Sequence, residues 1–126
     1  MKVATAVTVP RLVKWVLENR RDRAFHGWTL EQIGCNILYG IEHRCMFYST
    51  DSEGMLNGIA VSSRDDSKRE IYVHAMLTTQ PRVMRDFVLA FAKHFPGYSL
   101  VATRHDRPHT FNLKRLIPKL LKGAQH

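Results

Sequence analysis

The sequence predicts an α/β (α+β) fold, in which helices pack on a mixed, mostly antiparallel sheet and the elements follow the order β-α-α-β-β-β-α-β-α. Three observations lead to this prediction. Short turn-forming stretches separate three β-prone segments in the middle of the chain, as in antiparallel hairpins. Apolar residues at helical spacing flank these segments on both sides. The chain has 126 residues, so we expect a single domain over residues 1–126.

The first part of the chain predicts one strand and two helices. Residues 2–9 are rich in Val and Thr and end before a proline, which is typical of a short strand. Residues 10–20 begin with that proline and carry apolar residues at helical spacing, so they are expected to form a short amphipathic helix. Thr29 and Gln32 form a T-x-x-Q capping box, and the helix that they start is expected to run to about His43.

Three strands are expected next, at Cys45–Thr50, Met55–Ser63 and Arg69–Thr78. Because alternate side chains of a strand lie on opposite faces, each face of the third strand can be read from the sequence. One face is expected to carry Ile71, Val73, Ala75 and Leu77, and the other Tyr72, His74, Met76 and Thr78.

Pro81–Phe95 predicts the clearest helix, whose apolar side chains are expected to face the sheet, namely Met84, Phe87, Val88, Phe91 and Phe95. This helix joins the strand before it to a strand at Tyr98–Thr103. We therefore expect the two strands to run parallel, as in a crossover connection. Residues 104–109 are expected to form a polar loop, and the leucine spacing over 113–121 predicts a last helix, which would start at Phe111.

The positive charge is concentrated in the last third of the chain. The formal net charge is +8 overall, +1 over residues 1–79 and +7 over residues 80–126. Such a basic region favours an anionic partner: phosphate groups, nucleic acid or an acidic protein surface. We expect no membrane span and a cytoplasmic protein, since no apolar run is long enough to cross a bilayer. Cys35 and Cys45 are too few for a disulfide scaffold and are expected to be small buried side chains.

The element order, together with the stretches Met76–Thr79, Tyr98–Arg104 and Phe111–Leu116, resembles the GNAT acyltransferase fold. The chain looks most similar to short GNAT-like proteins of tailed bacteriophages. The resemblance implies that the two parallel strands splay apart and hold acetyl-CoA or another acyl-CoA between them. It also implies a phage-encoded protein, in the host cytoplasm or the virion, with virion or host proteins as partners.

The resemblance places the cofactor site on Met76 and Leu77 and on the following turn into the helix. In the family, an R/Q-x-x-G-x-G/A motif holds the pyrophosphate there on backbone amides. Gln80 or Arg82 would fill the first position of this motif, but no glycine follows either residue. Arg82 and Arg85 would then hold phosphates by their side chains. The alternative is that both arginines belong to a solvated helix face.

The resemblance assigns the catalytic chemistry to His74 and Tyr98. An acyl transfer to an amine uses a base for the amine and an acid for the departing thiolate. His74, in the middle of its strand, is the candidate base, and Tyr98 is the candidate for a role beside the splay. The alternative for each is a structural side chain. The last helix has no tyrosine, because it would start at Phe111.

Three functions are compatible with these residues. The favoured one is a degenerate, non-catalytic GNAT-fold protein, because it explains both the absent glycines and the absent tyrosine. The alternatives are an acyl-CoA-dependent N-acyltransferase and a basic nucleic-acid-binding module, so whether the chain is an enzyme stays open. His105, Asp106 and His109 lie in one polar stretch, but they form no complete ligand set, and no metal is expected.

Overall fold

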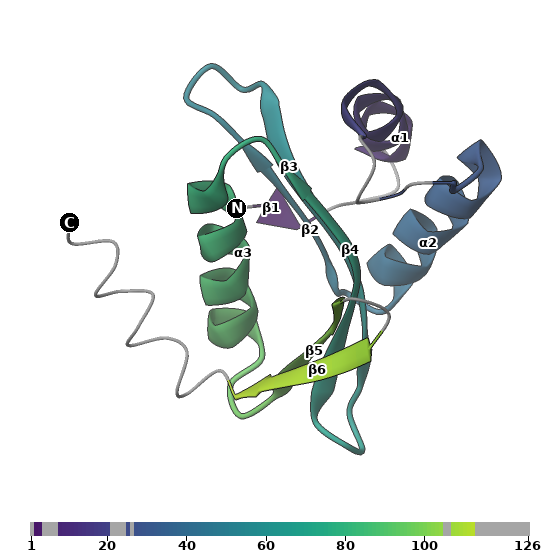
Figure 1. Cartoon of the computed structure of the whole chain (residues 1–126). Helices are drawn as coiled ribbons and strands as arrows, with labels where there is room; N and C mark the ends of the chain where they lie inside the picture. The colour runs from purple at the N-terminus through teal and green to yellow at the C-terminus, as the bar shows by residue number, and fades with distance from the viewer. Residues whose placement is uncertain (1, 4–7, 21–24, 26, 105–106, 113–126) are drawn as a thin grey trace.

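The computed structural model describes residues 2–3, 8–20, 25, 27–104 and 107–112. This part of the chain forms three helices and six strands (Figure 1). Their bounds are β1 Lys2–Val3, α1 Val9–Asn19, α2 Leu30–Glu42, β2 Met46–Thr50, β3 Leu56–Asp65, β4 Glu70–Thr78, α3 Pro81–His94, β5 Ser99–Arg104 and β6 Arg107–Asn112.

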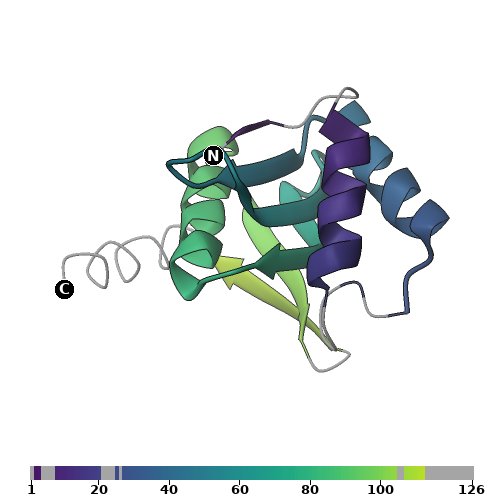
Figure 2. The ribbon, with the colours of Figure 1, turned by 90° about the horizontal axis from the view of Figure 1, so that it is seen from above.

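The six strands form one sheet in the order β1-β2-β3-β4-β5-β6, so that sequence neighbours are also neighbours in space. All adjacent pairs are antiparallel except β4 and β5, which are parallel. The mixed, mostly antiparallel sheet and the parallel pair around α3 are confirmed. In the two views, α1 and α2 lie on one face of the sheet and α3 on the other (Figures 1 and 2).

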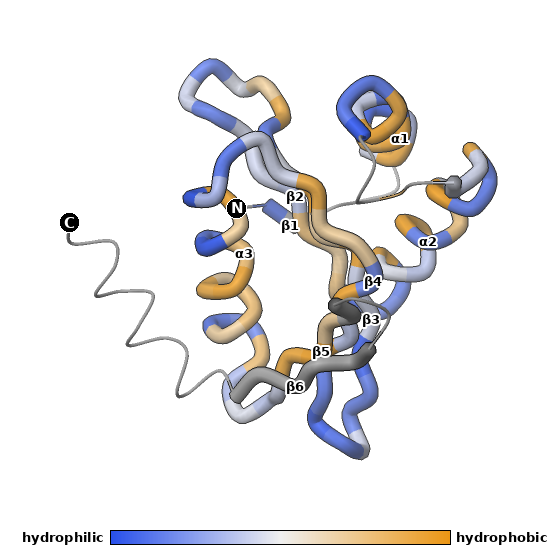
Figure 3. Tube along the Cα trace, in the orientation of Figure 1, coloured by the Kyte–Doolittle hydropathy of each residue, from blue (hydrophilic) through white to orange (hydrophobic). Residues whose placement is uncertain are grey.

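Each face of the sheet has its own apolar core. On the α1–α2 face, Leu12, Val16, Ile33 and Ile37 pack against β2 and β3. The capping box of Thr29 and Gln32 is confirmed: Thr29 N–H donates to Gln32 Oε1 over 2.8 Å, and Gln32 N–H donates to Thr29 Oγ1 over 3.1 Å. The second core follows the sheet-facing side of α3, where apolar residues line the helix (Figure 3).

Aromatic side chains of α3 fill the second core. Phe87 and Phe91 are fully buried, and the Phe91 ring meets the Phe47 ring of β2 edge to face at 5.3 Å. Phe95, just after the helix, is also buried. The expectation for Met84 is wrong, because this side chain is 49 % exposed and Val83 is buried in its place. The buried stripe therefore begins one residue earlier than the sequence indicates.

Gly58 of β3 sets how closely α3 approaches the sheet. A Cβ atom at this position would lie 2.7 Å from both Val83 Cγ1 and Phe87 Cε2, which is closer than carbon atoms pack. The first turn of α3 can therefore rest directly on the backbone of β3. Gly58 pairs with Thr78, at the end of β4, so this contact fixes the start of α3 beside the point where β4 ends.

Two expectations about element bounds are wrong. Thr8 and Val9 belong to the start of α1 rather than to a strand over 2–9, and residues 4–7 lie outside the described part. The polar stretch expected as a loop over 104–109 contains the last residue of β5 and the first half of β6, which pairs with β5 along its whole length. Phe111 is therefore part of a strand. The helix expected over 113–121 lies outside the described residues.

No helix in the described part of the chain is long and apolar enough to span a membrane.

Candidate functional site

His74 occupies a β-bulge in β4. Val61 of β3 pairs with Ala75, but the next residue of β3, Ser62, pairs with Val73. One extra residue, His74, is therefore inserted in β4 without a partner in β3. A bulge of this kind re-aims side chains and often ends regular pairing, which makes it a common feature beside binding and catalytic sites.

After the bulge, the side chains of β4 lie on the opposite face of the sheet from the one expected. The expected alternation along the whole strand is therefore wrong. Before the bulge, Ile71 and Val73 pack into the core beneath α3. After it, Ala75 and Leu77 pack into the core beneath α1 and α2. One inserted residue shifts the period-two pattern by one position, so every later side chain changes face. Strict alternation along the sequence cannot reveal such a shift.

The imidazole of His74 contacts a serine of the neighbouring strand. The Ser63 hydroxyl oxygen lies 2.7 Å from His74 Nε2. Ser63 is buried, whereas His74 remains exposed on its other side. Partial burial of the imidazole lowers the pKa of His74 below its ordinary value, because desolvation disfavours the charged ring. The ring is therefore neutral at pH 7 and is able to accept a proton.

The strands β4 and β5 stop pairing beside the bulge. Their ladder runs from Glu70–Ser99 to Val73–Ala102, whereas β4 continues to Thr78 and β5 to Arg104. Residues 74–78 of β4 continue past this ladder. Among the described residues, no strand pairs with them on the edge that faces β5 (Figure 1). An open strand edge presents N–H and C=O groups that an extended ligand can bind.

Met76 and Leu77 lie on this open stretch of β4, but they do not line one common surface. Met76 packs against the core beneath α3, whereas Leu77 packs against the core beneath α1 and α2. Successive residues of a strand direct their backbone N–H and C=O groups to opposite edges, and β3 already pairs with one edge of β4. A ligand along the open edge would therefore meet the backbone groups of only one of these two residues.

The start of α3 follows the end of the open edge at Thr78. Gln80 is the N-cap residue and is exposed, and its side chain makes no capping hydrogen bond. Pro81 occupies the first helical position, where it removes one backbone donor. The Val83 N–H donates to the Gln80 carbonyl oxygen over 3.0 Å. Arg82 is exposed and Arg85 half-buried, so this first turn carries two guanidinium groups near the positive end of the helix dipole.

The β3 side of the β4 terminus contains an unsatisfied polar atom. Thr79 donates its N–H to the Asn57 carbonyl oxygen over 3.0 Å, and its hydroxyl donates to the same oxygen over 3.3 Å. The side-chain oxygen of Asn57 is buried and has no hydrogen-bond partner among the described residues. Because β3 pairs with the edge of β4 opposite the open one, this atom is not part of the open edge.

Tyr98 lies at the opposite end of the site. The residue after it, Ser99, pairs with Glu70, where β4 begins, so Tyr98 is separated from His74 by roughly 15 Å of strand. The expectation that it lies beside the splay is wrong. Its hydroxyl donates to Asp66 Oδ1 over 2.6 Å, and this bond raises the pKa of Tyr98. Tyr98 therefore ties the β3–β4 turn to the start of β5.

The structure thus places His74 and the start of α3 at the two ends of one open stretch of β4, and it leaves Tyr98 out. It also adds Ser63, which the sequence analysis missed. A serine in a strand has no signal of its own, and the contact depends on the register of β3 against β4, which pairs Ser63 with Tyr72, two residues before His74. The two cysteines differ from each other: Cys45 is buried, as expected, whereas Cys35 is exposed.

Part of the basic C-terminal third lies outside this description. His105 and Asp106 are not among the described residues, and only the backbone is described for His109. Among the described residues, no group of three or more His, Cys, Asp or Glu side chains is placed to hold a metal ion.

Comparison of the chain with protein-family models, with curated proteins and with solved structures finds no match.

Proposed function

We propose that the chain is a GNAT-fold protein that binds an acyl-coenzyme A along the open edge of β4 and transfers the acyl group to an amine. The observation that carries this proposal is the position of His74. A neutral, half-accessible imidazole stands in a bulge at the residue where the β4–β5 ladder ends. A protein that needed only a stable sheet has no use for an interruption of two strands at that place.

The resemblance to the GNAT fold is supported by the order of the strands and the direction of one pair. The chain order β1-α1-α2-β2-β3-β4-α3-β5 matches the expectation, and β4 and β5 are parallel. The β4–β5 ladder ends at Val73 and Ala102, which agrees with the splay that the resemblance implies. After β5, the chain forms the antiparallel strand β6, where a loop and the start of a helix were expected.

The length of the open edge suits a ligand whose reactive group and phosphates are far apart. His74 and Gln80 are six residues apart, which corresponds to roughly 20 Å of extended chain. A thioester near His74 would therefore need a long arm to reach phosphates at the first turn of α3. Coenzyme A has such an arm, and its amide groups can pair with the free backbone groups of 74–78.

His74 would serve as the general base in this reaction. The amine nitrogen attacks the thioester carbonyl carbon, the C–S bond breaks, and the thiolate leaves with coenzyme A. The neutral imidazole accepts the proton that the attacking amine loses. Arg82 and Arg85 would hold the phosphates by charge-assisted hydrogen bonds, since the turn has no glycine to bring the backbone close.

A second candidate is a GNAT-fold protein that does not transfer acyl groups and instead binds an acidic protein partner, such as a virion or host protein. One observation favours it: the first turn of α3 is a poor phosphate cradle. Pro81 lacks a donor, and Val83 is buried against Gly58 with its N–H already bonded. In this candidate, Arg82 and Arg85 would contact carboxylates of the partner.

Calorimetric titration with acetyl-CoA, followed by an assay of thiol release with a lysine-containing peptide, separates the two candidates. For acyl transfer we expect binding in the micromolar range and steady release of coenzyme A thiol. His74→Gln should keep the binding within about threefold and lose the release, because the amide cannot accept the proton. Absence of binding at millimolar acetyl-CoA would overturn the acyl-transfer proposal and leave the protein-binding candidate.

A further inference from the structure

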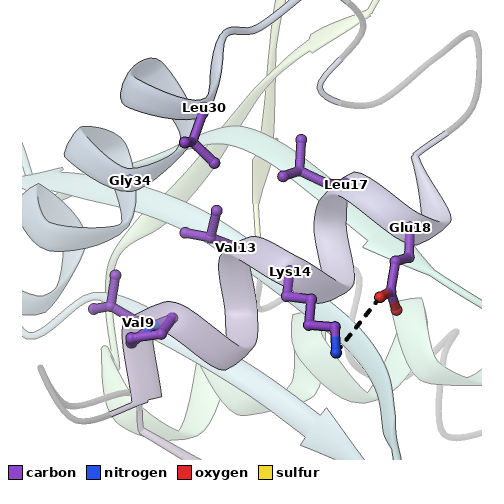
Figure 4. A pocket seen from close by; sticks show the side chains of 8 residues that line it. Val9, Val13, Lys14, Leu17, Glu18, Leu30 and Gly34 are labelled. Carbon is purple, nitrogen blue, oxygen red and sulfur yellow. Dashed lines mark ion pairs between the residues drawn. The ribbon is translucent and has the colours of Figure 1, made fainter.

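An open apolar groove lies between α1 and α2, on the outer side of the helix pair. Its volume is about 570 Å³, and it is lined mainly by apolar residues of both helices (Figure 4). These residues are Val9, Pro10, Val13, Leu17, Leu30 and Gly34. The groove is on the face of the sheet opposite α3 and is therefore separate from the first turn of that helix (Figure 2).

Exposed apolar side chains are concentrated on these two helices. Leu30 is 59 % exposed, Leu38 47 % and Leu17 39 %. Leu30, Gly34 and Leu38 are four residues apart, so they form one stripe along α2. A contiguous apolar patch on a helix pair is typical of a surface that another protein covers.

Gly34 gives this surface a depression one turn away from a projecting side chain. Glycine is a poor helix former, and a Cβ atom at position 34 would meet nothing within 4 Å. Packing within the chain therefore does not require glycine there. Leu30 projects from the preceding turn of the same stripe. The surface therefore carries a projecting leucine side chain one turn away from a position with no side chain.

We infer that this groove is a two-fold interface with a second copy of this chain. In a two-fold contact the same patch is present on both sides, so Leu30 of each copy can insert over Gly34 of the other. The leucine and the depression are then satisfied together, with no other protein required.

The charges at the rim of the groove also favour a second copy of this chain as the partner. Lys14 and Glu18 line the groove on successive turns of α1, and their Nζ and Oε1 atoms are 3.9 Å apart (Figure 4). When two α1 helices meet antiparallel, Lys14 of each copy faces Glu18 of the other. A uniformly acidic or uniformly basic partner would instead place a like charge opposite one of the two residues.

Sedimentation velocity of the full chain over a concentration range of about 1–100 µM tests this inference. We expect a monomer–dimer equilibrium with a dissociation constant in the micromolar range, which suits a two-helix interface. Gly34→Leu fills the depression and should weaken the dimer at least tenfold. This variant also replaces glycine by a good helix former in open space, so its Tm should be no lower than that of the parent.

Three further variants complete the test. Leu30→Glu should abolish the dimer, whereas Met55→Glu, at an exposed methionine of the β2–β3 turn, should leave it unchanged. Lys14→Glu should weaken the dimer, and the double variant Lys14→Glu with Glu18→Lys should restore it, because the opposite charges then face one another again. A monomer at every concentration would overturn the inference. A dimer that Gly34→Leu and Leu30→Glu do not affect would also overturn it.

Discussion

The Ser63 hydroxyl oxygen lies 2.7 Å from Nε2 of His74, across the boundary between β3 and β4. Ser63 pairs with Tyr72, and His74 lies two residues further along β4 on the same face, so the contact is a diagonal one between the two strands. The hydrogen bond holds the ring by Nε2. Ser63 is therefore a positioning residue for the candidate base.

The Ser63–His74 contact predicts a change in the tautomer balance of His74 when Ser63 is replaced by Ala. The hydroxyl favours one protonation pattern of the ring, and its loss should let the two neutral tautomers become more equally populated. Nitrogen chemical shifts of the imidazole measure this balance. Ser49→Ala, at a buried serine of β2, is the matched control and should leave the His74 signals in place. Equal effects of both variants would contradict the assigned role of Ser63.

The lowered pKa of His74 predicts a loss of stability in acid. The folded state resists protonation of the ring, whereas the unfolded state accepts a proton at the ordinary pKa of about 6.5. The unfolded state therefore binds more protons as the pH falls through that value toward the lower folded-state pKa. The stability is present above pH 6.5 and is lost below it.

Thermal unfolding at pH 7.5 and pH 5.5 measures this effect. The Tm of the parent should fall more between the two buffers than the Tm of His74→Gln, since the amide does not titrate. Met55→Gln should behave like the parent, because this exposed side chain is remote from the ring. If the parent and His74→Gln lose the same number of degrees, the folded structure does not resist protonation of His74.

The fold was largely predictable because its helices and hairpins are encoded locally. Thr29 and Gln32 cap α2 as their spacing indicates, and the crossover through α3 makes β4 and β5 parallel. The bulge at His74 was not predictable, because it depends on how β3 and β4 align rather than on any residue in β4. The faces of the β4 residues after His74 therefore cannot be derived from alternation along the sequence, and the Ser63 contact requires the register of β3 against β4.

Two other errors have physical causes of the same kind. The sequence of β6 is polar and contains a proline, so it looks like a loop, yet pairing with β5 makes it a strand. Val83 is buried instead of Met84. Gly58 has no side chain, so the helix packs against β3 on the side that carries Val83. In both cases a neighbouring element decides the local structure.

The close approach of α3 to β3 predicts opposite effects for two glycine substitutions. Gly58→Ala should destabilise the fold by about 1–3 kcal/mol, because the new Cβ atom overlaps Val83 and Phe87 at 2.7 Å. Gly34→Ala is the matched control, in open space on α2, and should stabilise the fold by about 0.5–1 kcal/mol. Urea denaturation gives both values. A neutral Gly58→Ala would mean that α3 is not held against the strand.

The core beneath α3 predicts a large difference between two apolar residues that are about two turns apart in this helix. Phe91→Ala should cost about 3–5 kcal/mol, since the ring is fully buried and packs on Phe47. Met84→Ala, at a side chain that is 49 % exposed, should change the free energy of unfolding by less than about 0.5 kcal/mol. If Phe91→Ala does not fold, Phe91→Leu should still show a loss in the urea midpoint. Similar losses for positions 84 and 91 would contradict the helix orientation.

The two arginines of the first turn of α3 predict where a phosphorylated ligand binds. Arg82 and Arg85 lie near the positive end of the helix dipole, beside the open edge of β4. Each charge-assisted hydrogen bond to a phosphate contributes about 1.5–3 kcal/mol. Replacing both residues by Ala should therefore weaken acetyl-CoA binding by one to several orders of magnitude.

The control for this double variant removes the same net charge elsewhere on the protein. Lys93 lies in the last turn of α3, and Arg69 lies just before β4 begins, so both are at the far end of the site. Their double Ala variant should bind acetyl-CoA like the parent.

A short oligonucleotide, titrated at low and moderate salt, tests the nucleic-acid alternative. If Arg82→Ala/Arg85→Ala loses only the oligonucleotide, with a steep salt dependence, then backbone phosphates of nucleic acid are the ligand and the acyl-CoA assignment fails. Equal weakening of acetyl-CoA binding by both double variants would instead reflect the overall charge of the protein, and the first turn of α3 would not be the site.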